Sequence, residues 1–219
     1  ELEWLTNRSG WVRVTSNIQI RPSTEKQPNP LANKYGAGSG LAKKYVLQGG
    51  VEFADASLNN GSTLRSGVGA DKAYGVGFQN GDAYGMGLKP MPGITGFSIE
   101  CSGPFGALKT ANIKIKTYDL EQFNIIETLY LHLGMSVIVE FGHVPYIDNS
   151  GKFVSTPKLL DVFNINSKEQ IAQNITSQRS KTGGNYDALF GTVINYSWTT
   201  SNDGSYDIDL KVMGPGSVL

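Results

Sequence analysis

The chain has 219 residues, of which 39% are hydrophobic, and its 19 acidic and 19 basic side chains give a formal net charge of zero. A chain of this length buries about 70% of its unfolded surface, so one or two domains can hold a core without disulfides or a metal. The neutral balance argues against a dedicated nucleic-acid-binding protein. Because no apolar run approaches the roughly 18 residues of a membrane span and the N-terminus lacks a signal pattern, a soluble protein is expected.

The first 89 residues are predicted to form an N-terminal arm followed by a glycine-rich extended region. Residues 11–20 alternate in polarity, which predicts a strand, and residues 45–53 predict a second one. The stretch from Gly36 to Gly106 holds 17 of the 27 glycines, too many for helix interiors. The sequence begins at Glu1 rather than at a methionine, which fits a processed or partial product.

The clearest order lies in residues 90–142, where the pattern predicts a strand, a helix and a second strand. Ala111, Ile113 and Ile115 alternate with polar residues, which is typical of a strand with one covered face. Residues 135–141 are apolar on both parities, so they predict a strand that is covered on both faces. Between these strands, Asp119 and Gln122 form a capping arrangement that starts a helix.

This helix is predicted to be about fifteen residues long and amphipathic. Gly134 stands where a left-handed residue would end it. Its apolar stripe consists of Leu120, Phe123, Ile126, Tyr130 and Leu133, widened by Ile125 and Leu129.

The C-terminal third predicts a turn, a short polar helix and a β-hairpin. The turn lies at residues 148–151, and Ser167 with Gln170 begins the helix over about 168–180. Because its stripe is only Ile171 and Ile175, the helix is expected on a surface or against a neighbouring subunit. The hairpin joins residues 192–200 to 206–212 and places Ile194, Tyr196 and Trp198 on one apolar face with Tyr206, Ile208, Leu210 and Val212.

The sequence contains no pattern that favours a catalytic or metal-binding site. Ser155 and Lys158, with a Lys-Thr-Gly triplet at 181–183, echo penicillin-recognising enzymes, but the serine does not open a helix and the triplet does not form a strand. Glu140 and His143 would point to opposite faces of a strand, so a metal site is not expected. The glycine groups at 36–40 and 85–87 do not complete a phosphate-binding loop. No cofactor and no enzymatic activity are therefore predicted.

The single cysteine and the glutamates of the sequence each leave more than one interpretation open. The sole cysteine, Cys101, shares the strand phase of Phe97 and Ile99, which favours a buried thiol over a reactive one. Paired carboxylates for glycoside cleavage are assembled in space rather than in sequence, so a cell-wall hydrolase stays a minor hypothesis. The available side chains are Glu100, Glu121, Glu127 and Glu140.

A broader pattern covers most of residues 85–216, with smaller pieces nearer the N-terminus. It consists of Trp11-Val-Arg13, the stretch from Ala73-Tyr-Gly to Lys89-Pro-Met-Pro-Gly93, the block ending in Val139-Glu-Phe-Gly142, Gly184-Asn-Tyr-Asp-Ala188, Gly191-Thr-Val-Ile-Asn-Tyr-Ser-Trp198 and Asp203-Gly-Ser-Tyr-Asp207. In these segments the chain resembles the baseplate hub and tail-tube-like virion structural proteins of large tailed bacteriophages with contractile tails.

The resemblance implies a mainly β (α+β) fold, an antiparallel β-barrel tube-type domain over residues 90–219. One amphipathic helix flanks it, and a loop and helix insertion lies at about 145–186. It also implies a trimeric or hexameric ring in a virion tail or baseplate, assembled in the host cytoplasm with other tail proteins. DNA would pass through the channel without specific binding, which favours placing Lys114 and Lys116 outside the lumen.

The alternative function is a carbohydrate-binding or host-recognition module of a virion. It rests on aromatic side chains beside polar turns, namely Tyr74, Phe78 and Tyr84. A core or interface ribbon is the commoner explanation of such a pattern.

Overall fold

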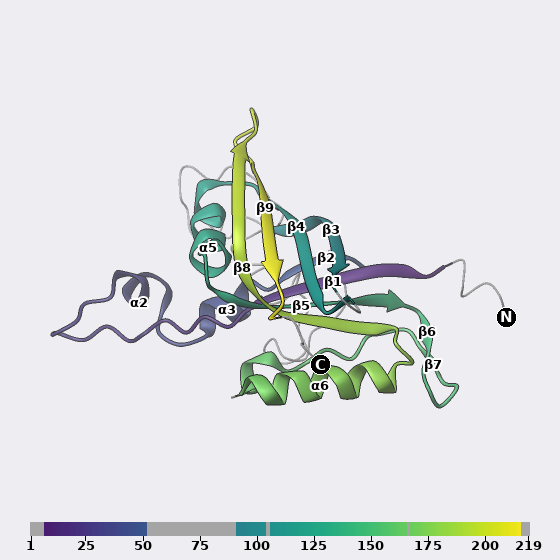
Figure 1. Cartoon of the computed structure of the whole chain (residues 1–219). Coiled ribbons are helices and arrows are strands. Elements are labelled where there is room, and N and C mark those ends of the chain that lie inside the picture. The colour runs from purple at the N-terminus through teal and green to yellow at the C-terminus, as the bar shows by residue number, and fades with distance from the viewer. Residues whose placement is uncertain (1–6, 52–90, 104–105, 166, 216–219) are drawn as a thin grey trace.

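The computed structural model describes residues 7–51, 91–103, 106–165 and 167–215. In this part of the chain, seven strands form one antiparallel sheet in the order β2-β1-β5-β8-β9-β4-β3, which curls into a half-barrel (Figure 1). The strands are β1 (Ser9–Ser16), β2 (Leu47–Gly50), β3 (Gly93–Ser102), β4 (Leu108–Thr117), β5 (Ser136–Val144), β8 (Tyr186–Thr200) and β9 (Tyr206–Met213). The mainly β, α+β fold class expected from the sequence is confirmed.

The remaining elements are short strands and helices around this sheet. A two-stranded hairpin is formed by β6 (Tyr146–Ile147) and β7 (Phe153–Val154), around the turn predicted at residues 148–151. The helices are α2 (Pro30–Tyr35), α3 (Gly40–Lys44), α5 (Leu120–Tyr130) and α6 (Lys168–Lys181), with one 3-10 turn, η3 (Val162–Asn164).

Strand β4 has the phase that its sequence predicts. Ala111, Ile113 and Ile115 are each at most 1% exposed, whereas Lys114 between them is exposed. Strand β5 is also buried on both parities, as its continuous apolar run predicts.

Helix α5 begins as predicted but ends earlier. The Asp119 side chain accepts a hydrogen bond from the Gln122 amide, and the Gln122 side chain accepts one from the Tyr118 amide. The helix stops at Tyr130, so the prediction of fifteen residues is wrong. Gly134 does adopt a positive φ of 84°, but in the turn that follows the helix.

Two members of the predicted stripe consequently lie outside the core. Leu120, in the first turn of α5, is 58% exposed, and Leu133, beyond the end of the helix, is 67% exposed. The residues of the stripe between them are buried, so the face of α5 is predicted correctly and its length is not.

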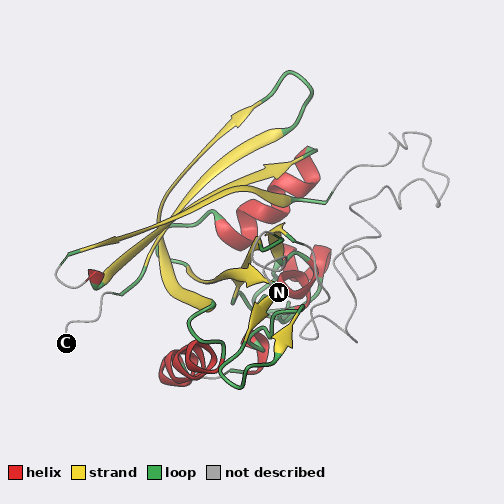
Figure 2. Ribbon diagram, turned by 90° about the vertical axis from the view of Figure 1, so that its right-hand side faces the viewer, coloured by secondary structure: helices red, strands yellow, loops and turns green. Residues whose placement is uncertain are grey.

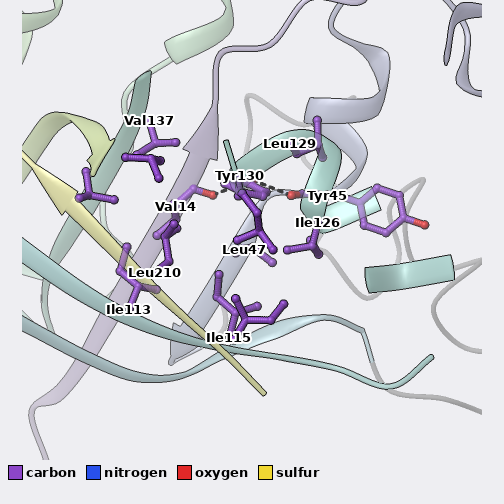
Figure 3. Packing of buried hydrophobic residues seen from close by; sticks show 14 of the residues in the cluster. Val14, Tyr45, Leu47, Ile113, Ile115, Ile126, Leu129, Tyr130, Val137 and Leu210 are labelled. Atoms are coloured by element: carbon purple, nitrogen blue, oxygen red, sulfur yellow. Dashed lines mark hydrogen bonds between the residues drawn. The ribbon is translucent and has the colours of Figure 1, made fainter. Parts of the chain in front are cut away.

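The sheet has a separate hydrophobic cluster on each face of β1 and β5. The first cluster includes Val12 and Val14 of β1 and the buried face of α5. At its centre, the Tyr130 hydroxyl donates to the carbonyl oxygens of Tyr45, at 2.7 Å, and Val14, at 3.2 Å (Figure 3). Burial raises the pKa of Tyr130 far above its usual value, so this hydroxyl stays protonated.

Replacing Tyr130 by phenylalanine is expected to lower the free energy of unfolding by about 1–2 kcal/mol, because two buried carbonyl groups lose their donor. Urea unfolding monitored by circular dichroism measures this loss. Tyr206→Phe serves as the matched control, since Tyr206 is only half-buried. Equal stability of both variants would contradict the role of the Tyr130 hydroxyl.

Helix α6 covers the second cluster, on the other face of the sheet (Figure 2). Ser167 caps it by accepting from the Gln170 amide, as the sequence predicts. Its thin stripe, Ile171 and Ile175, packs with Trp11 and Ile138 of the same chain. The helix therefore lies on this chain's own sheet.

The C-terminal hairpin forms as expected, but its strand phase changes midway. The register between β8 and β9 shifts between Val193 and Asn195, which marks a β-bulge. Val193 is 1% exposed and Ile194 is 38% exposed. The prediction that Ile194 lies on the covered face is wrong, because the bulge moves Val193 to that face instead.

The buried state predicted for Cys101 is also wrong, since the thiol is exposed. Cys101 lies near the end of β3, an edge strand of the sheet. Its phase partners Phe97 and Ile99 are themselves only half-buried, so sharing their parity does not place a side chain in the core.

Strands β1 and β2 precede residue 90 and pair in the same sheet as the later strands. The division of the chain into residues 1–89 and 90–219 stays a prediction. The span predicted as an insertion, at about 145–186, holds β6, β7, η3 and α6.

Candidate functional site

The carboxylates and histidines considered for chemistry lie in different surroundings. Glu100, Glu121 and Glu127 are exposed, as are His132 and His143. Glu140 alone of the four glutamates is fully buried. Within the described residues, no group of three His, Cys, Asp or Glu side chains could hold a metal ion.

The pieces that echo penicillin-recognising enzymes do not form that arrangement. Ser155 lies outside the helices and is exposed, and Lys181 is the last residue of α6. The Tyr74, Phe78 and Tyr84 ribbon behind the carbohydrate-binding alternative lies outside the described residues.

A buried ion pair joins two neighbouring strands of the sheet. Arg13 of β1 and Glu140 of β5 lie directly opposite each other, and both side chains are 0% exposed. The Arg13 Nε donates to Glu140 Oε2 at 2.7 Å, and Arg13 Nη2 contacts the same oxygen. Two charges without water need such close pairing, because the cost of removing either one from water is several kcal/mol.

The same pair holds the segment that crosses the second face of the sheet. Glu140 Oε1 accepts from the Leu160 amide at 2.9 Å, and Arg13 Nη2 donates to the Leu160 carbonyl at 2.7 Å. The Tyr186 hydroxyl of β8 donates to Glu140 Oε1 at 3.0 Å. Burial, and next the charge of Glu140, raise the pKa of Tyr186 well above its usual value, which keeps the donor protonated.

The sequence carries a signal for this buried ion pair, although alternation along the strands does not reveal it. Arg13 stands within an apolar run of β1, and Glu140 stands within a strand predicted to be covered on both faces. A charged residue in such a strand has no solvent-facing side, so it needs a buried partner. The arrangement fixes the fold and offers no open access for a substrate.

A second charged cluster ties α6 to the sheet. Asp187 of β8 accepts from Lys109 Nζ at 2.8 Å and from Arg179 Nε at 3.1 Å. Partial burial alone would raise the pKa of Asp187, but the hydrogen bonds from Lys109 and Arg179 outweigh it and hold the pKa below its usual value.

The outer face of β8, β9, β4 and β3 is polar, and its charges are balanced. Lys114 lies opposite Asp209, and Lys116 lies opposite Asp207 at 3.8 Å. Three lysines on this face are matched by three carboxylates; the six residues are Lys114, Lys116, Lys211, Glu100, Asp207 and Asp209.

Both sides of this four-stranded section have open edges among the described strands. Strand β5 pairs with β8 no further than Thr192, so residues 195–200 of β8 pair only with β9. At the other side, β3 pairs only with β4. The beginning of β3 lies close to β2, as a Cβ atom built on Gly49 of β2 would come within 2.7 Å of the Ile94 carbonyl oxygen. The open part of the β3 edge therefore consists of residues 97–102.

With this geometry established, the chain was compared with known proteins. It matches no protein-family model, no curated protein and no solved structure. Among the described helices, none is both long and apolar enough to cross a membrane.

Proposed function

We propose that the chain is a non-catalytic structural component of a phage tail or baseplate. It forms part of the hub or of a ring continuous with the tail tube, in three or six copies, together with other tail or baseplate proteins. The observation that carries this proposal is the four-stranded section β8-β9-β4-β3, which is open at both edges among the described strands.

The directions of the strands suit a sheet that continues from copy to copy. All neighbours in the section are antiparallel, so β8 and β3 run in opposite directions. The β3 edge of one copy can therefore meet the β8 edge of the next in an antiparallel pairing. In Figure 1, β8 and β9 rise well beyond the level of β5, and residues 197–200 of β8 are exposed.

The composition of the open edge supports the same conclusion. Residues 97–102 of β3 read Phe-Ser-Ile-Glu-Cys-Ser, with one charge and neither lysine nor proline. Monomeric proteins commonly protect an exposed edge with those residues, because unprotected edges pair with other chains. An edge buried by a neighbouring copy needs no such protection.

The balanced polar face suits the lining of a channel for DNA. An excess of lysine would bind phosphates and retain the nucleic acid, with an affinity that depends on salt. Lys114 and Lys116 each face an aspartate across the strands, which removes the reason for placing them outside the lumen. DNA can then pass along this face without specific binding.

Placing a lysine on the open edge is expected to prevent assembly while leaving the fold intact. Cys101→Lys adds a charge at an exposed position of β3, where it would have to be desolvated on pairing. Sedimentation velocity should show trimers or hexamers for the unmodified chain and monomers for this variant.

Phe153→Lys is the matched control, because Phe153 is 56% exposed on β7, outside the main sheet. It should assemble like the unmodified chain. A monomeric unmodified chain at high concentration, or full assembly of Cys101→Lys, would contradict the proposed edge pairing.

A further inference from the structure

The open segments of β3 and β8 are equally long and can pair along their whole length. Among the described strands, they consist of residues 97–102 of β3 and residues 195–200 of β8. Because the two strands run in opposite directions, full overlap sets a single register, in which Ser98 of one copy lies opposite Thr199 of the next. Any shift along the strands shortens the ladder and forfeits main-chain hydrogen bonds.

This register also keeps the faces of the sheet continuous from copy to copy. Within one copy, Ile99 lies opposite Ala111, on the apolar face of β4. Trp198 lies opposite Ile208, which is on that same face. Full overlap places Ile99 directly opposite Trp198 of the next copy. A slip by one residue would instead place apolar side chains opposite polar ones, because neighbouring residues of a strand point to opposite faces.

The main-chain groups of β8 point to its open side at the even-numbered residues. The Ser201 amide donates to the Ser205 carbonyl at 2.8 Å, directly beyond the end of the ladder between β8 and β9. Main-chain groups alternate between the two sides of a strand, so the odd-numbered residues of the open segment bond toward β9. Tyr196, Trp198 and Thr200 therefore present their N–H and C=O groups at the open edge.

The main-chain groups of β3 point outward at the complementary residues. The Lys109 carbonyl accepts from the Gly214 amide at 2.9 Å, so odd-numbered residues of β4 bond toward β9 and even-numbered ones bond toward β3. From residue 97 onward, even-numbered residues of β3 lie opposite those even-numbered residues of β4, so its odd-numbered residues face the open side. Ile99 and Trp198 of neighbouring copies can therefore exchange both main-chain hydrogen bonds.

Trp198 provides an apolar anchor at this edge. Its side chain is 49% exposed, although it packs edge-on against Phe123 of α5, with ring centroids 5.1 Å apart. Phe123 in turn stacks on Tyr206 at 4.6 Å, so the indole is held on one side while half of its surface stays accessible. Tryptophan is enriched among the residues that contribute most to binding at protein interfaces, so covering it with Ile99 of the next copy stabilises the contact.

We propose that copies of the chain join in this one register, with Ile99 of β3 paired to Trp198 of β8 in the next copy and Ser98 paired to Thr199. The inference rests on the proposed ring and adds to it which residues meet at the joint between copies. No like charges lie opposite each other there, because Glu100 is the only charged residue in the two segments.

Disulfide trapping between copies tests the register. In a Cys101→Ser background, Ser98→Cys together with Thr199→Cys places two thiols at exposed positions of the polar face. In the proposed register they form a non-hydrogen-bonded pair, whose Cα atoms lie about 4.5 Å apart, within the span of a disulfide. Within one copy the same two positions are separated by β4 and β9, about 14 Å, so only a link between copies can form.

Oxidation by copper phenanthroline and dissolved oxygen should convert the assembled variant to covalent trimers or hexamers on a non-reducing gel. A second pair in the same register, Glu100→Cys with Ser197→Cys, should link as well. The matched control is Ser98→Cys with Ser197→Cys, which reports a register shifted by two residues. It should give at most about a tenth as much linked product, because diagonal neighbours lie about 7–8 Å apart.

The outcomes separate the register from the ring itself. Assembled protein in which neither in-register pair links, or in which the control pair links more strongly, overturns the proposed register while the ring-forming role stands. An unmodified chain that sedimentation velocity shows to be monomeric at high concentration overturns both.

Discussion

Replacing Glu140 by alanine is expected to lower the free energy of unfolding by about 3–5 kcal/mol. The change leaves the Arg13 guanidinium buried with its ionic partner gone, and the Leu160 amide and the Tyr186 hydroxyl also lose their acceptor. Guanidinium chloride unfolding at pH 7 measures the loss. This loss is a large fraction of an ordinary protein's total stability, which is only about 5–15 kcal/mol.

Two comparisons separate the buried charge from a general effect of mutation. Glu127→Ala, at an exposed position of α5, should change stability by no more than about 0.5 kcal/mol. Replacing Arg13 and Glu140 together by methionine and leucine should cost less than Glu140→Ala, because no unpaired charge then remains. Equal stabilities of Glu140→Ala and Glu127→Ala would show that the ion pair does not hold the fold.

Ile115→Lys is expected to abolish folding, at a cost of about 4 kcal/mol or more. Ile115 is 1% exposed in the centre of β4, where a lysine ammonium group has neither water nor a partner. Thermal unfolding and the yield of soluble protein measure the effect.

Ile194→Lys provides a sharp control, because strand alternation in the sequence predicts both isoleucines on covered faces. The bulge in β8 exposes Ile194 by 38%, so its replacement should cost no more than about 1 kcal/mol. If both variants unfold alike, the phase of β8 is wrong. If both are stable, the phase of β4 is wrong.

The features that sequence predicts well here are local ones. Asp119 and Ser167 start their helices as their spacing indicates, since a cap depends on residues only three positions apart. The phase of β4 also follows from alternation alone. The bulge at Ile194 has no comparable local signature, because one extra residue is visible only against the partner strand β9.

Long-range contacts explain the other errors. Arg13 and Glu140 are 127 residues apart, and neither residue type predicts a buried pair before their strands are known to be neighbours. Alternation predicts a buried Cys101 because it gives the face of a strand but not whether anything covers that face.

The open-edged section and the buried core have separate roles in this interpretation. The Arg13 and Glu140 pair joins two strands within one copy, whereas the proposed ring would use β3 and β8 for the contacts between copies. An edge pairing between preformed sheets requires little reorganisation, so assembly can occur without refolding of the subunit.

Cryo-electron microscopy of the assembled, purified chain tests the central proposal most directly. The ring-forming role predicts a closed ring of three or six copies, with the sheet continuous between β3 and β8 and with Lys114 and Asp209 facing the central channel. A monomer, or a ring in which helix α5 faces the channel and the polar face points outward, would contradict it.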